Sequence, residues 1–123
     1  MINDLNRTTL IGYLAADAEV KNAKGKDFVT FSIATNTRWK DKDGNPQRQA
    51  EWHNIVVWKG RGPIKYAADL KKGDRVYLEG QLHYDFYEKK MGNENVKIPT
   101  VEIYANNIER LTERAADESS EAA

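Results

Sequence analysis

The sequence predicts an all-β domain: a five-stranded Greek-key barrel with one helix between strands three and four and two protruding hairpins. Three observations predict it. β-branched and aromatic residues alternate with polar residues in five segments, which is the period of strands. Clusters of Gly, Asn, Asp and Pro separate these segments. The stretch between the third and fourth segments instead carries apolar residues at helical spacing. With 123 residues, the chain has room for one such domain.

The first two strands are predicted at residues 7–14 and 28–37. In the first strand, Gly12 indicates a bulge or a bend where a barrel strand must curl. In the second strand, alternation separates two faces, as is typical of a strand with one buried face. One face carries Val29, Phe31 and Ile33, and the other carries Thr30, Ser32 and Ala34.

The remaining strands are predicted at residues 49–58, 75–87 and 96–111. Turn-forming residues between the strands predict two hairpin tips. The first tip, DKDGNPQ at residues 41–47, suits a long hairpin that protrudes from the body of the domain. The second tip is EKKMGNEN at residues 88–95.

Residues 63–70, PIKYAADL, predict the helix. Pro63 suits the first helical position, and the apolar residues after it recur at helical spacing. Lys71, Lys72 and Gly73 then supply a basic last turn and a stop. A helix between strands three and four of a five-stranded Greek-key barrel is the element order of the OB fold.

The composition argues against several kinds of chemistry. The chain has no cysteine and therefore no disulfide, thiolate nucleophile or thiolate zinc site, as suits a reducing cytoplasm. With two histidines, we expect neither a transition-metal site nor a cofactor. The chain does not start with basic residues followed by an apolar run, and it has no apolar stretch of membrane-spanning length. We therefore expect a cytoplasmic protein that does not contact membranes.

The formal net charge of zero at first argues against a polyanionic partner. Its distribution changes that interpretation. Residues 113–123 hold four acidic residues and one Arg, a balance of minus three, so residues 1–112 carry plus three. We expect residues 1–112 to form the domain. Residues 113–123 are predicted to be a short, acidic, disordered tail, because they are small and acidic and include no aromatic residue.

The segment EWHNIVVW within the third strand is the most informative part of the sequence. Alternation places Trp52, Asn54 and Trp58 on one face and His53 on the other. If the His53 face points inward or into a subunit contact, both tryptophans face outward. The alternative that the tryptophans simply cover the core stays open, because large aromatic side chains bury well.

Trp39 favours an exposed role for the tryptophans, because it lies between two cations at the base of a polar hairpin. Exposed aromatic residues interleaved with cations suit single-stranded nucleic acid, since every base has a π-face and every nucleotide has a phosphate. Each cation alone is more often a solvated surface charge than a phosphate contact. The candidate phosphate-binding residues are Arg38, Lys40, Lys42, Arg48, Lys59, Arg61, Lys65, Lys71, Lys72 and Arg75.

Four stretches carry a family resemblance: NRTTLIGYLAADAEV, FSIATN leading to RWKD, EWHNIVVW, and YAADLKKGDRVYLEGQL. Over about residues 5–112, the chain resembles the bacterial and mitochondrial single-stranded DNA-binding protein family. The resemblance implies an OB fold, a homotetramer around which DNA wraps, and no enzymatic activity. It also implies a protein that coats and protects single-stranded DNA in replication, recombination and repair, in a prokaryotic cytoplasm at the nucleoid.

The resemblance assigns roles to individual residues. The family's stacking aromatic residues fall on Trp39, Trp52, Trp58 and Tyr87. Asn54 stands where the family often has a DNA contact from Arg, so we expect slightly weaker binding there. His53 matches a position associated with subunit contacts, while its interpretation as a histidine satisfied within its strand stays open.

The end of the chain departs from the family pattern. Typical members continue into a long linker rich in Gly, Gln and Pro, which ends in acidic residues and a hydrophobic tip that recruits replication and repair enzymes. This sequence ends in DESSEAA. Recruitment of such enzymes through the C-terminus is therefore doubtful.

Two other classes of function stay open. Asp41, Asp43 and Glu51 could be the metal-binding carboxylates of a nuclease. However, Asp-Gly-Asn-Pro is ordinary turn chemistry, and no phosphate-binding loop or nucleophile motif accompanies it. The second class is an OB-fold accessory or RNA-binding module, because one fold supports several uses and stacking does not distinguish the two sugars.

Overall fold

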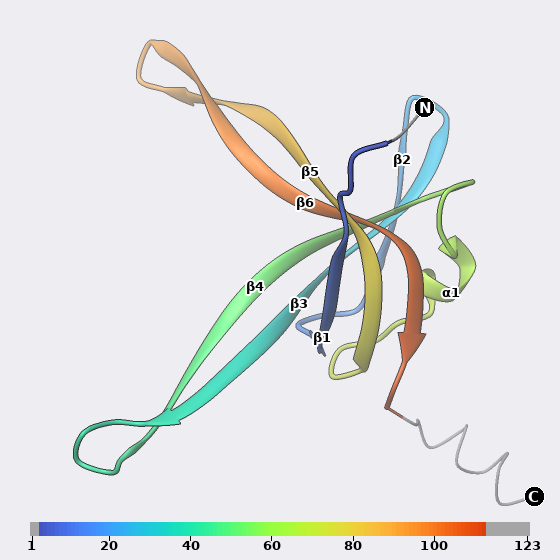
Figure 1. Cartoon of the computed structure of the whole chain (residues 1–123). Coiled ribbons are helices and arrows are strands. Elements are labelled where there is room, and N and C mark those ends of the chain that lie inside the picture. Colours follow the sequence, from blue (N-terminus) through green and yellow to red (C-terminus); the bar gives the residue numbers. More distant parts are fainter. Residues whose placement is uncertain (1–2, 113–123) are drawn as a thin grey trace, which may run out of the picture.

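The computed structural model describes residues 3–112, which form six strands and one short helix (Figure 1). The helix is α1 (Ile64–Ala68), which lies between β4 and β5 as predicted but is shorter than residues 63–70. The strands are β1 (Thr8–Leu14), β2 (Glu19–Ala23), β3 (Lys26–Lys40), β4 (Pro46–Trp58), β5 (Arg75–Met91) and β6 (Glu94–Arg110).

Five of the strands pair in a closed ring. The sheet order is β1-β5-β6-β4-β3-β2, and an additional pairing of β1 with β3 closes the ring. All pairings are antiparallel except that of β4 with β6, where Ile55 lies opposite Ile103. The ring, with α1 between β4 and β5, is the Greek-key OB arrangement. The fold class predicted from the sequence is confirmed.

Strand β2 was not predicted from the sequence. Every residue of β2 is exposed, so the segment lacks the alternation that indicates a half-buried strand. It pairs only with β3, outside the ring. Lys24 and Gly25 join the two strands with φ of 52° and 80°. A two-residue hairpin turn with positive φ at both positions favours Gly. The Lys-Gly pair was therefore the feature of the sequence that could have indicated this hairpin.

The strands of both protruding hairpins extend further than the sequence predicts. β3 and β4 stay paired as far as Lys40 and Pro46, and β5 and β6 as far as Met91 and Glu94. The added residues are largely polar and exposed. Ladder hydrogen bonds satisfy their backbone groups whatever the side chains are, which explains strand structure without a hydrophobic pattern. Two arms therefore project from the barrel, away from α1 (Figure 1).

Gly12 marks a close approach of two strands. β1 pairs with β5 up to Tyr13 and with β3 at Tyr13 and Leu14. A Cβ atom on Gly12 would lie 2.5 Å from the carbonyl oxygen of Ala34 on β3, so only glycine fits where the ring closes. The predicted bend is therefore a strand crossing. The predicted bulge at Gly12 is wrong, because the irregularity in the ladder lies between Glu79 and Gly80 on β5.

The core fills the inside of the ring. Val29, Phe31 and Ile33 are buried in it, as one face of the second predicted strand. Residues from the other ring strands and from α1 and its C-terminal side complete the core. They are Leu14, Ile55, Val57, Ala67, Leu70, Val76, Leu78, Ile103, Ala105 and Ile108.

Candidate nucleic-acid interface

The outer face of β4 carries the residues that alternation assigned to it. Ile55 and Val57 belong to the core, so Trp52, Asn54 and Trp58 point outward. The hydroxyl of Ser32 on β3 donates a hydrogen bond to Oδ1 of Asn54 across the ladder, at 3.1 Å. This outer face of β3 and β4 is therefore the base of the candidate site.

Three of the four predicted stacking residues are well exposed. The exposed fraction is 47% for Trp39, 63% for Trp52 and 50% for Tyr87. All three lie on the arms or where an arm leaves the barrel, so little protein covers them. Trp58 differs, because it is half-buried at the end of β4. The sequence left open that the tryptophans only cover the core. This interpretation applies in part to Trp58, which is half-buried, and hardly applies to Trp52.

Trp58 belongs to a line of four rings, which we call the aromatic band (Phe28, Trp58, Tyr104 and His83). The ring centroids of Phe28 and Trp58 are 4.6 Å apart, and those of Trp58 and Tyr104 are 6.1 Å apart in an edge-on arrangement. His83 stacks on Tyr104 at 4.2 Å. Sequence reasoning missed three members, because only the cross-strand register brings them together.

The band is tightly packed around Trp58. Burial raises the pKa of the Tyr104 hydroxyl, and the nearby Trp58 indole N–H acts in the opposite direction. That N–H is buried and completes no hydrogen bond of regular geometry with the described residues. The Trp58 ring is therefore held by ring packing against Phe28 and Tyr104.

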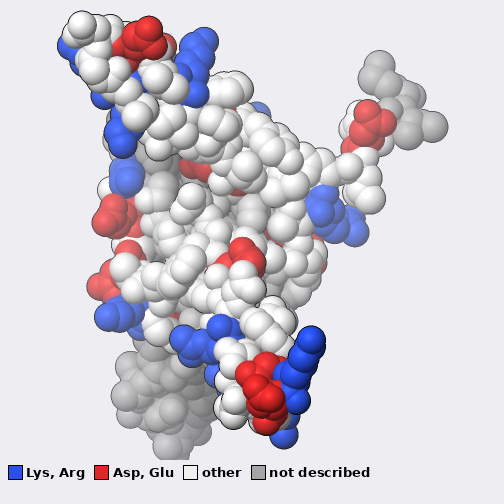
Figure 2. All heavy atoms as spheres, turned by 90° about the vertical axis from the view of Figure 1, so that its left-hand side faces the viewer, with Lys and Arg blue, Asp and Glu red and all other residues white. Residues whose placement is uncertain are grey.

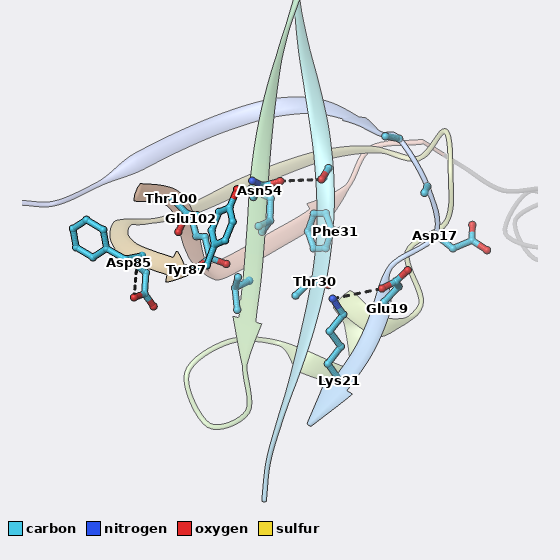
Figure 3. Close-up of a pocket in the computed structure, with 16 residues that line it drawn as sticks. Asp17, Glu19, Lys21, Thr30, Phe31, Asn54, Asp85, Tyr87, Thr100 and Glu102 are labelled. Atoms are coloured by element: carbon cyan, nitrogen blue, oxygen red, sulfur yellow. Dashed lines mark hydrogen bonds and ion pairs between the residues drawn. The ribbon is translucent and has the colours of Figure 1, made fainter. Parts of the chain in front are cut away.

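A hollow of about 610 Å³ opens beside Asn54 on the outer face. Tyr87, Thr100 and Glu102 of the β5–β6 arm face Asn54 across it (Figure 3). Its charged lining residues are four carboxylates and one lysine, which lies 3.7 Å from one of the carboxylates. None of the ten predicted phosphate-binding residues lines it. The hollow therefore disfavours phosphate and suits the uncharged bases.

The cations predicted at the first hairpin lie together. Arg38 and Lys40 on β3 and Arg48 on β4 border one shallow groove with Trp39. Lys42 lies in the turn that joins the two strands. Seen from the side toward which both arms project, Lys and Arg are prominent at both arm ends, where Asp and Glu also lie, and the surface between the ends is mostly uncharged (Figure 2). The cations of the first hairpin are therefore close together but are mixed with acidic residues.

The cations predicted around the helix lie elsewhere. Lys59 and Lys65 border a small cavity beside α1, and the Arg75 guanidinium lies 5.7 Å from the ring centroid of Tyr13. Arg61, Lys71 and Lys72 are exposed in turns. α1 lies on the side away from the arm ends (Figure 1). The structure therefore does not gather the ten cations into one patch.

The ten cations nevertheless have their charges available. Between residues 3 and 112, the ion pairs are Lys21 with Glu19 and Arg110 with Asp69. Neither pair uses a predicted phosphate-binding residue. A cation without a carboxylate partner need not break an ion pair to bind phosphate. All ten predicted cations can therefore bind phosphate without that cost.

His53 lies on the core-side face of β4 and is half-buried. Its Nε2 is 2.9 Å from the hydroxyl oxygen of Thr35 on β3. This hydrogen bond gives the ring a partner within its own sheet. The subunit-contact role of His53 stays a prediction.

The acidic residues of the first hairpin serve the turn. The Asp41 carboxylate accepts hydrogen bonds from the backbone N–H groups of Asp43 and Asn45, at 3.0 and 2.8 Å, and from the Gln47 amide at 3.1 Å. The Asn45 N–H is the largest cause of a lowered pKa for Asp41. The carboxylate that a nuclease would need for metal binding is thus used by local structure. Across residues 3–112, no group of His, Asp and Glu side chains could hold a metal ion.

The described helix is neither long nor apolar enough to cross a membrane. The predicted tail at residues 113–123 lies outside the described residues. The predicted domain boundary after residue 112 therefore also remains a prediction.

Residues 5–111 match the single-strand binding protein family. The chain belongs to this family. The match covers all six strands and the helix, so the OB barrel, its arms and the candidate interface lie within the region shared by single-strand binding proteins.

Relatives with known names include bacterial and mitochondrial proteins. Single-stranded DNA-binding protein 1 of Xylella fastidiosa is 39% identical over 109 residues, which are 87% of this chain and 77% of the relative. A Xanthomonas axonopodis pv. citri relative is 36% identical over 90% of this chain and 60% of its own length. The mitochondrial protein of Pongo abelii is 35% identical over 92% of this chain and 79% of its own length. The chain thus spans 60% to 79% of these relatives.

Solved structures agree with this assignment. A Plasmodium falciparum single-strand binding protein in complex with single-stranded DNA superposes with a TM-score of 0.73 at 27% identity. The superposition covers 91% of this chain and 99% of that one. A Thermus aquaticus single-stranded DNA-binding protein superposes with a TM-score of 0.67 at 24% identity, over 89% of this chain and 52% of that chain. The latter likeness supports the fold alone.

Proposed function

We propose that this protein binds single-stranded DNA without sequence preference, and that it coats and protects DNA exposed in replication, recombination and repair. The observation that carries the proposal is the exposure of Trp39, Trp52 and Tyr87 around the outer face of an OB barrel, beside cations that have no ion-pair partner among residues 3–112. Aromatic rings stack on any base, and cations hold phosphates whatever the sequence.

In this proposal, the DNA strand runs along the outer face of the barrel and onto the arms. Bases stack on Trp52 and Tyr87 and occupy the hollow beside Asn54, whose carboxylates repel phosphate. Phosphates are held at the ends of the arms, first by Arg38, Lys40 and Arg48. The cations around α1 contribute where the DNA continues past the barrel.

Binding, rather than catalysis, is the proposed activity. The Asp41 carboxylate is engaged by the turn, and Asp43 and Glu51 are exposed, with no third ligand beside them among residues 3–112. Stacking does not discriminate DNA from RNA, so RNA binding is the competing proposal. Location in a bacterial cytoplasm is part of this proposal and is supported by the bacterial relatives.

We also propose that the protein forms a homotetramer. An apolar stripe (Leu82, Tyr84, Phe86 and Val101) lines one face of the β5–β6 arm, with 68% of Tyr84 and 63% of Phe86 exposed. Leu82 pairs with Ile103, which is in the core, so the stripe continues the core face of the barrel onto the arm. Contiguous apolar surface of this kind marks a contact site. A second copy is the proposed occupant, because His53, which is predicted at a subunit contact, also lies on the core-side face of its strand.

Titration with oligo(dT), followed by tryptophan fluorescence, tests the proposed function. Strong quenching is expected, because two exposed tryptophans stack on bases. Unchanged fluorescence and unchanged mobility in a gel at saturating DNA would refute the proposal. Competition with oligo(rU) decides between DNA and RNA, since an RNA-binding module is retained by oligo(rU) in the presence of equal oligo(dT).

A further inference from the structure

The aromatic band crosses the strands instead of following one of them. Its rings come from β3, β4, β6 and β5, which are consecutive neighbours in the sheet. Each ring contacts the next, with centroids 4.6, 6.1 and 4.2 Å apart from Phe28 to His83. The band is therefore a continuous aromatic surface rather than a set of separate side chains.

The band lies on the outer face of the barrel. Tyr104 is in register with Val56 of β4, and Val56 is buried although it does not belong to the core cluster. Side chains on the outer face must therefore cover Val56. The four rings are themselves half-buried, so each keeps part of its surface in solvent. A partly exposed, closely packed aromatic surface is thus available to a ligand.

A cation lies against one ring of the band, as cations lie beside Trp39 on the β3–β4 arm. The Lys26 ammonium lies 5.6 Å from the centroid of the Trp58 ring. Burial is the main cause of the raised pKa of the Tyr104 hydroxyl; the charges of Glu102 and Asp85 raise it further, and Arg61 acts in the opposite direction. An aromatic ring with a cation beside it is a combination that binds single-stranded nucleic acid.

We propose that the base-stacking site predicted at Trp58 extends along the aromatic band as a base-binding platform, and that His83 and Tyr104 contact single-stranded DNA there. This inference rests on the proposed function and adds binding residues to it. His83 ends the band, and Tyr104 is the only ring of the described residues that stacks against it. A base that stacks on His83 continues the line.

The platform is separate from the rings on the arm. Trp52 and Trp58 lie six residues apart on β4, a distance of roughly 20 Å at about 3.3 Å per residue. One strand of DNA can therefore occupy both places, with the hollow between them. Tyr104 packs against His83, and Phe28 packs against Trp58. The platform therefore depends on neighbouring rings as well as on the rings that stack on bases.

Four variants test the platform in an oligo(dT) titration at fixed salt. Tyr104→Leu and His83→Ala are each expected to weaken binding about five-fold or more, the loss of roughly one stacked base. His83→Phe keeps a ring and is expected to retain affinity to within about two-fold. Tyr66→Leu is the matched control, because it removes an exposed ring on α1, outside the band. Its affinity should equal that of the wild type.

Ultraviolet cross-linking of the wild-type protein to oligo(dT) gives an independent test that needs no variant to fold. Cross-linked peptides containing His83 or Tyr104 are expected. Cross-links confined to the β3–β4 arm, or equal weakening by His83→Phe and His83→Ala, would overturn the platform. If Trp52→Ala weakens binding while Tyr104→Leu and His83→Ala do not, the platform fails and the proposed function stands. If the wild type does not bind oligo(dT), the proposed function itself fails.

Discussion

Trp52 lies directly opposite Ala34 in the β3–β4 ladder. The small side chain of Ala34 offers the indole little to pack against, and 63% of Trp52 stays exposed. A large apolar ring held in solvent on a rigid strand is pre-ordered for stacking. Trp52 can therefore be removed at little cost to the fold, which makes it the sharpest probe of binding.

Trp52→Ala should weaken oligonucleotide binding by about 1 to 3 kcal/mol, because one stacked base is lost. The loss should be similar for oligo(dT), oligo(dC) and oligo(dA), since every base has a π-face. Titrations at one salt concentration measure it. Trp58→Ala is the comparison, because its ring packs on Phe28 and Tyr104 and its loss should also lower the midpoint of urea unfolding. A loss restricted to one base would indicate edge recognition instead of stacking.

Arg48→Gln should weaken binding about equally for all sequences and reduce its salt dependence. Arg48 borders the groove with Trp39 and has no ion-pair partner among residues 3–112. Losing one phosphate contact to a single strand should lower the slope of log K against log salt by about 0.7. Lys24→Gln is the control, since Lys24 lies in the β2–β3 turn. An unchanged slope for Arg48→Gln would remove this residue from the phosphate contacts.

Gly12→Ala should destabilise the barrel by about 1 to 3 kcal/mol, the usual range for overpacking. The new Cβ would lie 2.5 Å from the Ala34 carbonyl oxygen, where β1 crosses from β5 to β3. The free energy of unfolding in urea measures the effect. Thr9→Ala, on the exposed side of the same strand, should change it little. If the two variants were equally stable, the strands at Gly12 would have room for a Cβ atom, which would contradict the close approach described above.

The β3–β4 tip should loosen in acid. Hydrogen bonds from Asn45, Gln47 and Asp43 lower the pKa of Asp41 below its ordinary value of 3.8. Its contribution to the turn is therefore complete above that value and is lost as pH falls through the lower folded pKa. The amide chemical shifts of Asp43 and Asn45 should follow this titration, and Asp41→Ala should abolish it. Shifts that titrate at or above the ordinary value would contradict the assignment.

Tyr84→Ser combined with Phe86→Ser should reduce self-association, because the pair removes the most exposed part of the apolar stripe. Sedimentation equilibrium at micromolar concentration should report smaller species for this variant than for the wild-type protein, which we propose to be a tetramer. Tyr13→Ser, an exposed tyrosine outside the stripe, is the matched comparison. A wild-type protein near 14.0 kDa would refute self-association altogether. A variant that remains tetrameric would move the contact to another surface.

The sequence by itself determined the barrel and the exposed arm residues. Alternation at Val29 and Ile33 reports burial directly, because successive strand side chains point to opposite faces. The turn at Asp41 and the helix after Pro63 follow from residues adjacent in the chain. Exposure of Trp39 followed from its charged neighbours in the sequence. Each of these properties depends on contacts among nearby residues, so a local pattern suffices to predict it.

Only the tertiary structure decided which distant residues meet. β2 has no buried face, so its existence depends on pairing with β3 rather than on its own pattern. The stacking of His83 on Tyr104 depends on the register of β5 against β6, and a shift of one residue would turn one of the rings to the opposite face. The same register gathers the apolar stripe on one face of the arm. Register is set by the whole ring of strands, and for that reason no local pattern in the sequence contains it.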